Sequence, residues 1–324
     1  MLLSELELGY MFCKGKFVAV TGTNGKTTCV TLMNHILKDK YQTFLCGNVG
    51  TPITSICEQT DENSVVICEV SSFMLETVSP YFAPDISVIL NITPDHISRH
   101  KTFDEYYKTK LKITNYQNEN SYLLLPANLW NITTSAQKLV VVGEKYKSNL
   151  IGEFNELNIA FCEKVCSILG IGKKEFSKRL KTFSPVAFRL QYLGKKRGVH
   201  YINDSKATNP DSTVNALKAM KKQSILLLGG SNKGNNFNEI FAIKNKIKLA
   251  IIYGQTADIL ENDALFCGFK KTIKFENLKE ALSYLHKLVK RGDTVLFSPA
   301  CASYDEFNNY IERGNYFNKY FNNL

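Results

Sequence analysis

Residues 21–28, Thr-Gly-Thr-Asn-Gly-Lys-Thr-Thr, combine the residue types that bind a nucleotide phosphate. They follow the apolar run 17–20 and precede a helical pattern over 30–37, which predicts a strand, a glycine loop and a helix. Such a turn directs backbone N–H groups at one point, where a lysine adds a cation and a threonine can ligate Mg²⁺. A tight βα turn without a ligand is the simpler alternative. We predict that the phosphates are bound by Gly22, Thr23, Asn24, Gly25, Lys26, Thr27 and Thr28.

Two possible metal ligands fall where further strands are predicted to end. Glu69 ends the apolar run 65–68, and His96 follows the run 86–90. In open α/β sheets, ligands gather at such strand ends. A lone histidine is more often structural, but this one shares its predicted sheet edge with a carboxylate. We therefore predict that both side chains bind a metal ion.

Two other polar residues carry weaker signals. Asn48 lies in a loop bracketed by glycines, which could present amides to an anionic substrate. Lys110 lies in the helical stretch 106–113, which is rich in lysine. The chemistry of this stretch alone predicts a solvated basic face.

Composition limits the classes of function. The formal net charge is +10, from 40 basic and 30 acidic residues, but the lysines are scattered and no RNA-binding signature occurs, so no nucleic-acid partner is expected. No apolar stretch is long enough to span a membrane, and the first residues lack a secretion signal. We expect a cytoplasmic protein with no membrane partner. None of the nine cysteines forms a Cys-x-x-Cys pair, so neither disulfides nor zinc are expected.

Apolar runs alternate with amphipathic segments of helical length, which is typical of α/β proteins with parallel sheets. The pattern breaks at Ser184-Pro185-Val186. The chain of 324 residues is long enough for two domains. We predict an α/β fold in which a P-loop-type central ATPase domain with a mostly parallel sheet, residues 15–187, precedes a C-terminal Rossmann-like α/β domain, residues 188–324.

Five segments, in order along the chain, resemble the Mur ligases: 21–28, 69–73, 91–100, 203–210 and 298–303. The strings Ser-Lys-Ala-Thr-Asn and Ser-Pro-Ala-Cys-Ala-Ser in the last two are similar to those of family members that add D-glutamate. The phosphate loop is shared with the other amino-acid-adding ligases and with folylpolyglutamate synthases. The resemblance implies a monomeric, ATP-dependent ligase that joins D-glutamate to UDP-N-acetylmuramoyl-L-alanine, through an acyl phosphate, in peptidoglycan precursor synthesis.

The resemblance also implies a metal site with two Mg²⁺ ions. Lys26 and Thr27 would handle the γ-phosphate of ATP and the first ion. The lysine at the position of Lys110 is carbamylated in the family, which turns a cation into an anion able to help hold the second ion. Glu69 and His96 would bind that second ion as well.

The remaining implied roles concern nucleotide and substrate. Asn158 and Arg189 match residues that contact ATP, Asp204 matches a ribose contact, and Lys206 lies near the transferred phosphate. The residues expected to bind the nucleotide sugar or D-glutamate are Asn48, Ser71, Thr208, Lys233, Ser303 and Tyr310.

The chain departs from the family pattern in three places. Tyr310 stands where phenylalanine is expected, and Phe154 replaces an expected histidine on the adenine side. Residues 1–14 resemble a linker that remains from an absent N-terminal domain, which would bind the UDP group. Two alternatives therefore stay open: an ATP-binding module without ligase activity, or another ligase of the Mur or folylpolyglutamate type.

Overall fold

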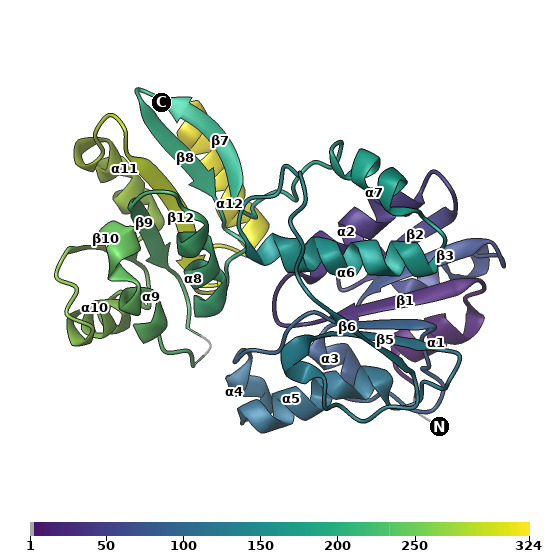
Figure 1. Ribbon diagram of the computed structural model, residues 1–324. Helices are drawn as coiled ribbons and strands as arrows, with labels where there is room; N and C mark the ends of the chain where they lie inside the picture. The colour runs from purple at the N-terminus through teal and green to yellow at the C-terminus, as the bar shows by residue number, and fades with distance from the viewer. Residues whose placement is uncertain (1–2, 233) are drawn as a thin grey trace. The chain divides into compact units, whose positions relative to one another are not determined.

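The computed structural model describes residues 3–232 and 234–324, and the chain forms two compact units. The first unit comprises Met1–Pro94 and Arg99–Ser184, and the second comprises Asp95–Ser98 and Pro185–Leu324. The chain passes between the units at the Ser184-Pro185 break, close to the predicted boundary after residue 187. Each unit has its own sheet and its own core (Figure 1).

The first unit is built on a six-stranded sheet in which every pair of neighbouring strands is parallel. The strand order is β2-β3-β1-β4-β5-β6, so β1 and β3 lie at the centre. Their apolar runs are buried because helices cover both faces of the sheet. The strands are β1 (Lys16–Thr21), β2 (Gln42–Gly47), β3 (Ser64–Glu69), β4 (Ile86–Ile89), β5 (Tyr122–Pro126) and β6 (Gln137–Val141).

Helices α2 and α6 pack together on one face of this sheet, and Leu6 of α1 and Tyr106 of α5 join the core on the other. Helix α1 lies in the segment expected to be a linker. Its capping box joins Ser4 and Glu7, and the buried Glu7 carboxylate also accepts hydrogen bonds from Ser79. The helices are α1 (Glu5–Phe12), α2 (Lys26–Leu37), α3 (Ser72–Leu75), α5 (Phe103–Leu111), α6 (Phe154–Ile168) and α7 (Lys173–Leu180).

The second unit contains a six-stranded sheet with the order β11-β10-β9-β12-β8-β7. Only the pair β7 and β8 is antiparallel, through a hairpin that turns at Arg197 and Gly198. All other neighbouring strands are parallel. The strands are β7 (Gln191–Lys196), β8 (Val199–Asn203), β9 (Ser224–Gly229), β10 (Ile247–Tyr253), β11 (Thr272–Phe275) and β12 (Thr294–Ala300).

Helices α11 and α12 bury one face of this second sheet, with Leu282 and Phe317 packed against Leu227 and Phe297. Helix α8 packs against β12, and α9 packs between α8 and α10. The helices are α8 (Pro210–Ala219), α9 (Asn238–Ala242), α10 (Ala257–Phe266), α11 (Leu278–Leu288) and α12 (Tyr310–Asn322), while α4 (Ile97–His100) lies where the chain passes between units.

The structure confirms the predicted α/β fold. Strands β2, β5 and β11 were not expected as strands from the sequence. Strands β2 and β11 lie at sheet edges and are only partly buried, so their sequences lack the continuous apolar run that predicts a buried strand. No helix among the described residues is long and apolar enough to cross a bilayer.

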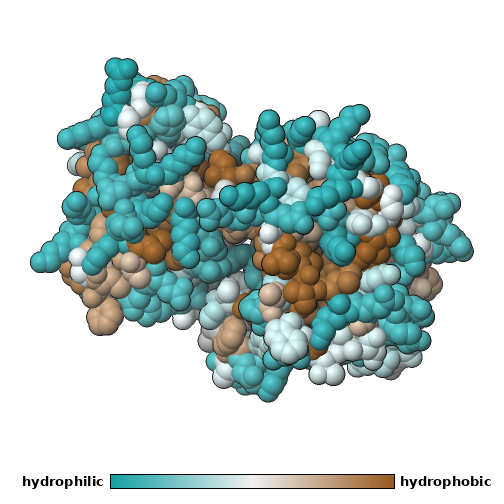
Figure 2. Space-filling view, in the orientation of Figure 1, coloured by the Kyte–Doolittle hydropathy of each residue, from teal (hydrophilic) through white to brown (hydrophobic). Residues whose placement is uncertain are grey.

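The first unit exposes some apolar side chains. Figure 2 shows apolar side chains on the first unit in the region of β6, where Val140 and Val142 are exposed.

All nine cysteines are free thiols, and seven of them are buried. They pack as small apolar side chains in the two cores.

Candidate functional site

The phosphate loop lies at the carboxyl end of β1, and α2 begins at Lys26. Gly25 precedes it with a φ of 92°, and a Cβ there would come within 2.6 Å of the Asn158 amide oxygen, so only glycine fits without strain. The Lys26 ammonium donates hydrogen bonds to the carbonyl oxygens of Gly22 at 2.7 Å and Thr23 at 2.8 Å. The loop therefore folds around its own lysine, and Asn158 lies directly beside it.

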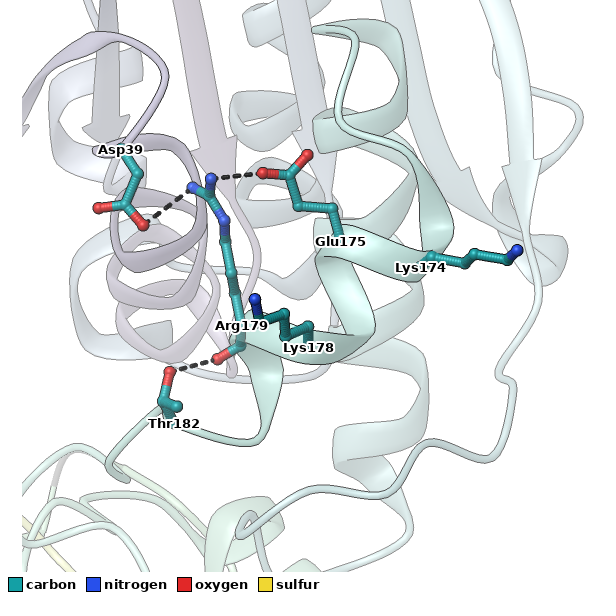
Figure 3. A pocket seen from close by; sticks show the side chains of 6 residues that line it. All are labelled: Asp39, Lys174, Glu175, Lys178, Arg179 and Thr182. Atoms are coloured by element: carbon teal, nitrogen blue, oxygen red, sulfur yellow. Dashed lines mark hydrogen bonds and ion pairs between the residues drawn. The ribbon is translucent and has the colours of Figure 1, made fainter.

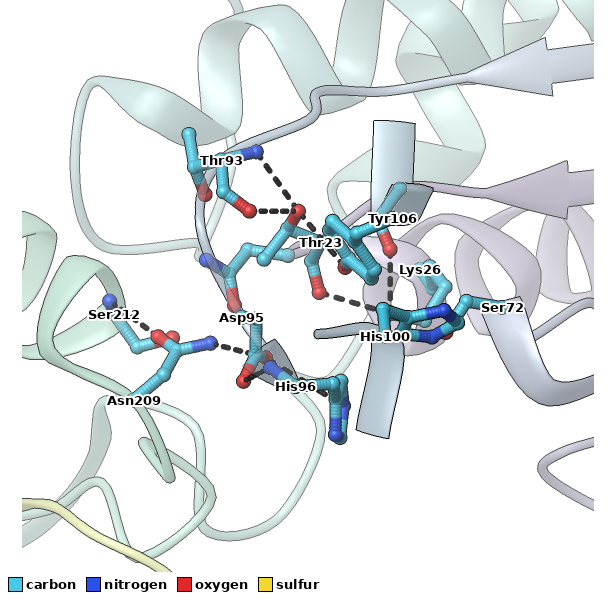
Figure 4. Close-up of polar contacts among 12 residues, drawn as sticks. Thr23, Lys26, Ser72, Thr93, Asp95, His96, His100, Tyr106, Asn209 and Ser212 are labelled. Atoms are coloured by element: carbon cyan, nitrogen blue, oxygen red, sulfur yellow. Dashed lines mark hydrogen bonds and ion pairs between the residues drawn. The ribbon is translucent and has the colours of Figure 1, made fainter. Parts of the chain in front are cut away.

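Residues from the segment after β4 and from α5 hydrogen-bond to the loop, and the sequence did not predict these contacts. Asn91 binds Asn24 reciprocally, accepting from its backbone N–H at 2.9 Å and donating to its carbonyl at 3.0 Å. The Thr23 hydroxyl donates to the Thr93 carbonyl and lies 3.1 Å from the Tyr106 hydroxyl (Figure 4). The only sequence signal was the position of Asn91 just after a predicted strand.

Lys110 is buried, so the expectation of a solvated face is wrong for this residue. Lys110 is only 1% exposed, whereas Lys108 on the same helix is exposed and forms an ion pair with Asp104. The Lys110 ammonium donates to the Gly22 carbonyl at 3.0 Å and the Thr21 hydroxyl at 3.3 Å. It also lies 4.8 Å from the centre of the Tyr106 ring. Lys26 and Lys110 thus converge on one carbonyl oxygen.

Glu69, at the carboxyl end of β3, is joined to Asn48. The Asn48 side-chain amide donates to Glu69 Oε1 at 2.9 Å, and the Asn48 backbone N–H donates to the Glu69 carbonyl. Glu69 Oε2 and Thr28 Oγ1 are buried and have no hydrogen-bond partner among the described residues. Ser71, just beyond, caps α3 by accepting from the Met74 N–H. The two orphaned oxygens fit the oxygen ligands that Mg²⁺ prefers.

His96 belongs to the short segment Asp95–Ser98, which groups with the second unit. Its backbone has a φ of 55°, and its N–H donates to Asp95 Oδ1 at 2.8 Å. Asp95 Oδ2 in turn accepts from the Asn209 amide at 2.9 Å, and Asn209 caps α8 through the Ser212 N–H (Figure 4). The second unit therefore fixes the backbone that carries this imidazole.

Asp204 follows β8 at the carboxyl edge of the second sheet and is buried. Its carboxylate accepts hydrogen bonds from the Ser298 hydroxyl at 2.7 Å and the Leu190 N–H at 3.0 Å. Burial raises the pKa of Asp204 to about 6, although both hydrogen bonds and the charge of Arg189 favour the ionised form. Arg189 and Asp204 are therefore near neighbours, as a nucleotide site in this unit would require.

Tyr310, which is proposed to bind D-glutamate, lies beside Lys206, which is expected near the transferred phosphate. The Lys206 ammonium lies 3.3 Å from the Tyr310 hydroxyl and 5.1 Å from its ring centre. Ser303 is buried and Thr208 is half-buried. Lys233 lies outside the described residues. Among the residues that the structure describes, no group of three or more His, Cys, Asp or Glu side chains could hold a metal ion.

A cavity of about 570 Å³ lies elsewhere in the first unit, between the end of α2 and α7 (Figure 3). Arg179 pairs with Asp39, which follows α2, at 3.2 Å and with Glu175 of its own helix at 2.5 Å. None of the predicted site residues lines it. Because two carboxylates already neutralise the guanidinium, this cavity is best explained as a junction between two helices.

The chain matches two family models, the Mur ligase middle domain over residues 20–139 and the Mur ligase glutamate ligase domain over residues 188–301. A UDP-N-acetylmuramoylalanine–D-glutamate ligase of Lachnoclostridium phytofermentans is 36% identical over 98% of this chain and 78% of its own length. The protein of the same name from Caldicellulosiruptor bescii is 37% identical over 100% of this chain and 78% of its own length. The chain belongs to the Mur ligase family.

Solved structures show the same Mur ligase fold. MurF from Thermotoga maritima in complex with ADP has a TM-score of 0.74 and 20% identity, covering 97% of this chain and 83% of its own. MurF from Acinetobacter baumannii also has a TM-score of 0.74 and is 16% identical, and the match covers 95% of this chain and 78% of that structure's chain. The resemblance found in the sequence motifs is thereby confirmed at the level of family and fold.

Proposed function

We propose that this Mur ligase is a cytoplasmic, monomeric enzyme that uses ATP to join D-glutamate to UDP-N-acetylmuramoyl-L-alanine. The named relatives support the choice of substrates. The observation that carries the chemistry is the convergence of Lys26 and Lys110 on the Gly22 carbonyl at the carboxyl end of β1. This arrangement concentrates cationic donors where a helix N-terminus already favours an anion, which suits a triphosphate.

The reaction has two steps. The carboxylate of the L-alanyl substrate attacks the γ-phosphorus of ATP and releases ADP, which leaves an acyl phosphate. The amine of D-glutamate then attacks the acyl carbon and phosphate departs. Lys26 stabilises the charge that develops on the γ-phosphate oxygens, and Lys206 does so for the transferred phosphate.

The second unit orients the nucleotide and the amino acid. Arg189 and Asp204 contact ATP, and the buried carboxylate is positioned by Ser298 and Leu190 to accept a hydrogen bond from a ribose hydroxyl. Asn158, beside Gly25 in the first unit, completes the ATP contacts. Asn48 and Ser71 bind the nucleotide sugar. The D-glutamate site consists of Thr208, Lys233, Ser303 and Tyr310.

We assign two Mg²⁺ ions to oxygen and nitrogen donors that follow the strands of the first sheet in the sequence. When bound, they offset the negative charge of the phosphates. Thr27 would hold the first ion. Glu69, His96 and a carbamylated Lys110 would hold the second, and the orphaned Glu69 Oε2 supplies the carboxylate oxygen that such an ion needs.

Carbamylation of Lys110 resolves a conflict in the site. Two ammonium groups that share the Gly22 carbonyl repel each other, and the buried one has lost its hydration. The ammonium first loses one proton to become an amine, and the amine nitrogen then bonds to the carbon of CO₂ and loses a second proton. The product is a carbamate anion, which removes that repulsion. Protein labelled with ¹³C-bicarbonate should show a carbamate carbon resonance that is absent in Lys110→Arg. Retention of the signal in that variant would contradict the assignment.

The activity is tested by phosphate release with ATP, Mg²⁺, UDP-N-acetylmuramoyl-L-alanine and D-glutamate. We expect release that requires D-glutamate and is not supported by L-glutamate, with a peptide-linked product detected by mass spectrometry. Phosphate release that never depends on D-glutamate would reject the ligase function. Size-exclusion chromatography with light scattering tests the monomer.

A further inference from the structure

The amino edge of the second sheet, where its parallel strands begin, is densely basic. Five connecting segments meet there, because the starts of β8, β12, β9, β10 and β11 lie in register with one another. We call their cations the basic edge: Lys195, Lys196, Arg197, Lys221, Lys222, Lys244, Lys246, Lys248, Lys270, Lys271, Lys290 and Arg291.

These cations account for the charge of the whole chain. The segments 194–199, 220–224, 243–248, 267–272 and 289–294 contain 12 basic residues and one acidic residue, Asp293. The remaining sequence has 28 basic and 29 acidic residues, so the formal charge of +10 resides at this edge. The lysines are scattered in the sequence, but the topology gathers them, because each parallel strand returns the chain to the same edge.

The connecting segments are tied to one another. Lys246 Nζ donates to the Met220 carbonyl and Lys244 Nζ to the Cys267 carbonyl, both at 2.8 Å. The Gly292 N–H donates to the Gly198 carbonyl at 2.9 Å. These bonds link neighbouring connections, so the cations lie together along one edge of the sheet.

Few of these charges are neutralised locally. Within the described part of the chain, the only ion pair of the basic edge joins Lys248 to Asp293 at 2.5 Å. Nine of the twelve side chains are in exposed residues, and Lys244 and Lys246 donate to neutral carbonyls. A strong positive field therefore reaches solvent here.

Two exposed apolar side chains flank this field. Leu265 and Phe266 end α10, directly before the segment that carries Lys270 and Lys271, and they are 53% and 82% exposed. An exposed phenylalanine and leucine beside lysines suit the boundary between lipid headgroups and acyl chains. Ten of the twelve cations are lysines, which act as point charges rather than as bidentate readers of a nucleic acid.

We propose that the basic edge is a peripheral docking surface for an anionic lipid bilayer, with Leu265 and Phe266 inserted at its headgroup level. Six strands spaced about 4.8 Å apart spread the charges over about 24 Å, which suits a broad charged surface. The candidate residues of the second unit, such as Asp204, follow the carboxyl ends of the same strands, so docking leaves that opposite edge accessible. This peripheral association requires no membrane-spanning helix, and it departs from the expectation, drawn from the sequence, that the protein has no membrane partner.

Flotation with vesicles tests the proposal on the full chain. We expect binding to vesicles of phosphatidylcholine with an equal amount of phosphatidylglycerol, weakening as salt rises, and no binding to phosphatidylcholine alone. Each lysine near an anionic surface contributes about fivefold in affinity, so Lys270→Glu/Lys271→Glu should weaken binding at least about 25-fold. The matched variant Lys174→Glu/Lys178→Glu changes the same charge on the exposed surface of the first unit and should have less than about a threefold effect.

Phe266→Ser separates lipid from nucleic acid as the partner. It should weaken vesicle binding about tenfold and leave the salt dependence unchanged, since it removes apolar contact and no charge. Equal effects of the two charge-reversal variants would overturn the proposal. So would tighter binding to a short DNA duplex than to the anionic vesicles. Circular dichroism of each variant checks folding, and ligase activity, read separately, tests the proposed function rather than the docking surface.

Discussion

The two sheets bury opposite charges at the same kind of edge. In the first unit, where the carboxylate of Glu69 is also buried, the ammonium of Lys110 before its proposed carbamylation lies against a hydroxyl, a carbonyl and an aromatic ring. In the second it is the carboxyl of Asp204, which lies against a hydroxyl and a backbone N–H. The direct hydrogen-bond partners of both groups are neutral, although Lys26 shares a carbonyl with Lys110 and the charge of Arg189 acts on Asp204, and such partners compensate only part of the lost hydration. We call Lys26 and Lys110, which share the Gly22 carbonyl, the cationic pole of the first unit, and Asp204 the acidic pole of the second unit.

At the cationic pole, Lys26→Met should cause the largest loss of activity. The variant removes a charged donor from the phosphate loop, and we expect kcat/KM to fall about 10³-fold, which corresponds to about 4 kcal/mol of transition-state stabilisation. Steady-state phosphate release measures the loss. Lys174→Met removes an equally long cation from the exposed surface of the same unit and should keep normal activity. Comparable losses in both variants would indicate a general charge effect.

The protonation of Asp204, the acidic pole, should make the free energy of unfolding depend on pH. Its pKa is about 6 in the folded protein and 3.8 in the reference state, so the folded state holds a proton that the unfolded state loses between these values. The stabilising contribution is therefore complete below pH 3.8 and is lost as pH rises to about 6, by up to about 3 kcal/mol. Urea unfolding from pH 4 to 7 should show this decline in the wild type and not in Asp204→Asn. Parallel pH profiles would contradict it.

The geometry around the cationic pole is tested by Gly25→Ala. The substitution requires a positive φ and brings Cβ to 2.6 Å from Asn158, so we expect a loss of about 1–3 kcal/mol in the free energy of unfolding. Gly172→Ala is the matched control, because that glycine has a φ of −70° and an added Cβ there would have no neighbour within 4 Å among the described residues. Urea denaturation compares the two. A cost for Gly172→Ala as large as that for Gly25→Ala would point to a glycine effect without the close contact.

The smallest expected change comes from Tyr310→Phe. The substitution keeps the ring that lies 5.1 Å from the Lys206 ammonium and removes only a hydroxyl at 3.3 Å. A weak hydrogen bond of this length contributes less than about 1 kcal/mol, so the KM for D-glutamate should change by less than about fivefold. Initial rates at varied D-glutamate measure it. A larger rise would mean that the hydroxyl itself contacts the substrate.

The sequence was most informative where chemistry and local structure coincide. The strand, glycine loop and helix around Lys26 follow from eight adjacent residues, and the fold class follows from the alternation of apolar runs. The hydrogen bonds of Asn91, Thr93 and Tyr106 to this loop could not be predicted, because they join residues 67 to 83 positions apart. The burial of Lys110 has the same origin, since only the packing of α5 against β1 decides which lysine of a basic helix faces inward.

The cysteines give this molecule a built-in reporter of its own opening. Seven thiols are packed inside the two cores and two are half-buried, and no disulfide ties any of them. A colorimetric thiol reagent should therefore react slowly with the intact protein and release a large signal only as a core opens. Because Cys301 is the only one of the seven that lies in the second unit, peptide mapping of the labelled thiols would reveal which half loosens first.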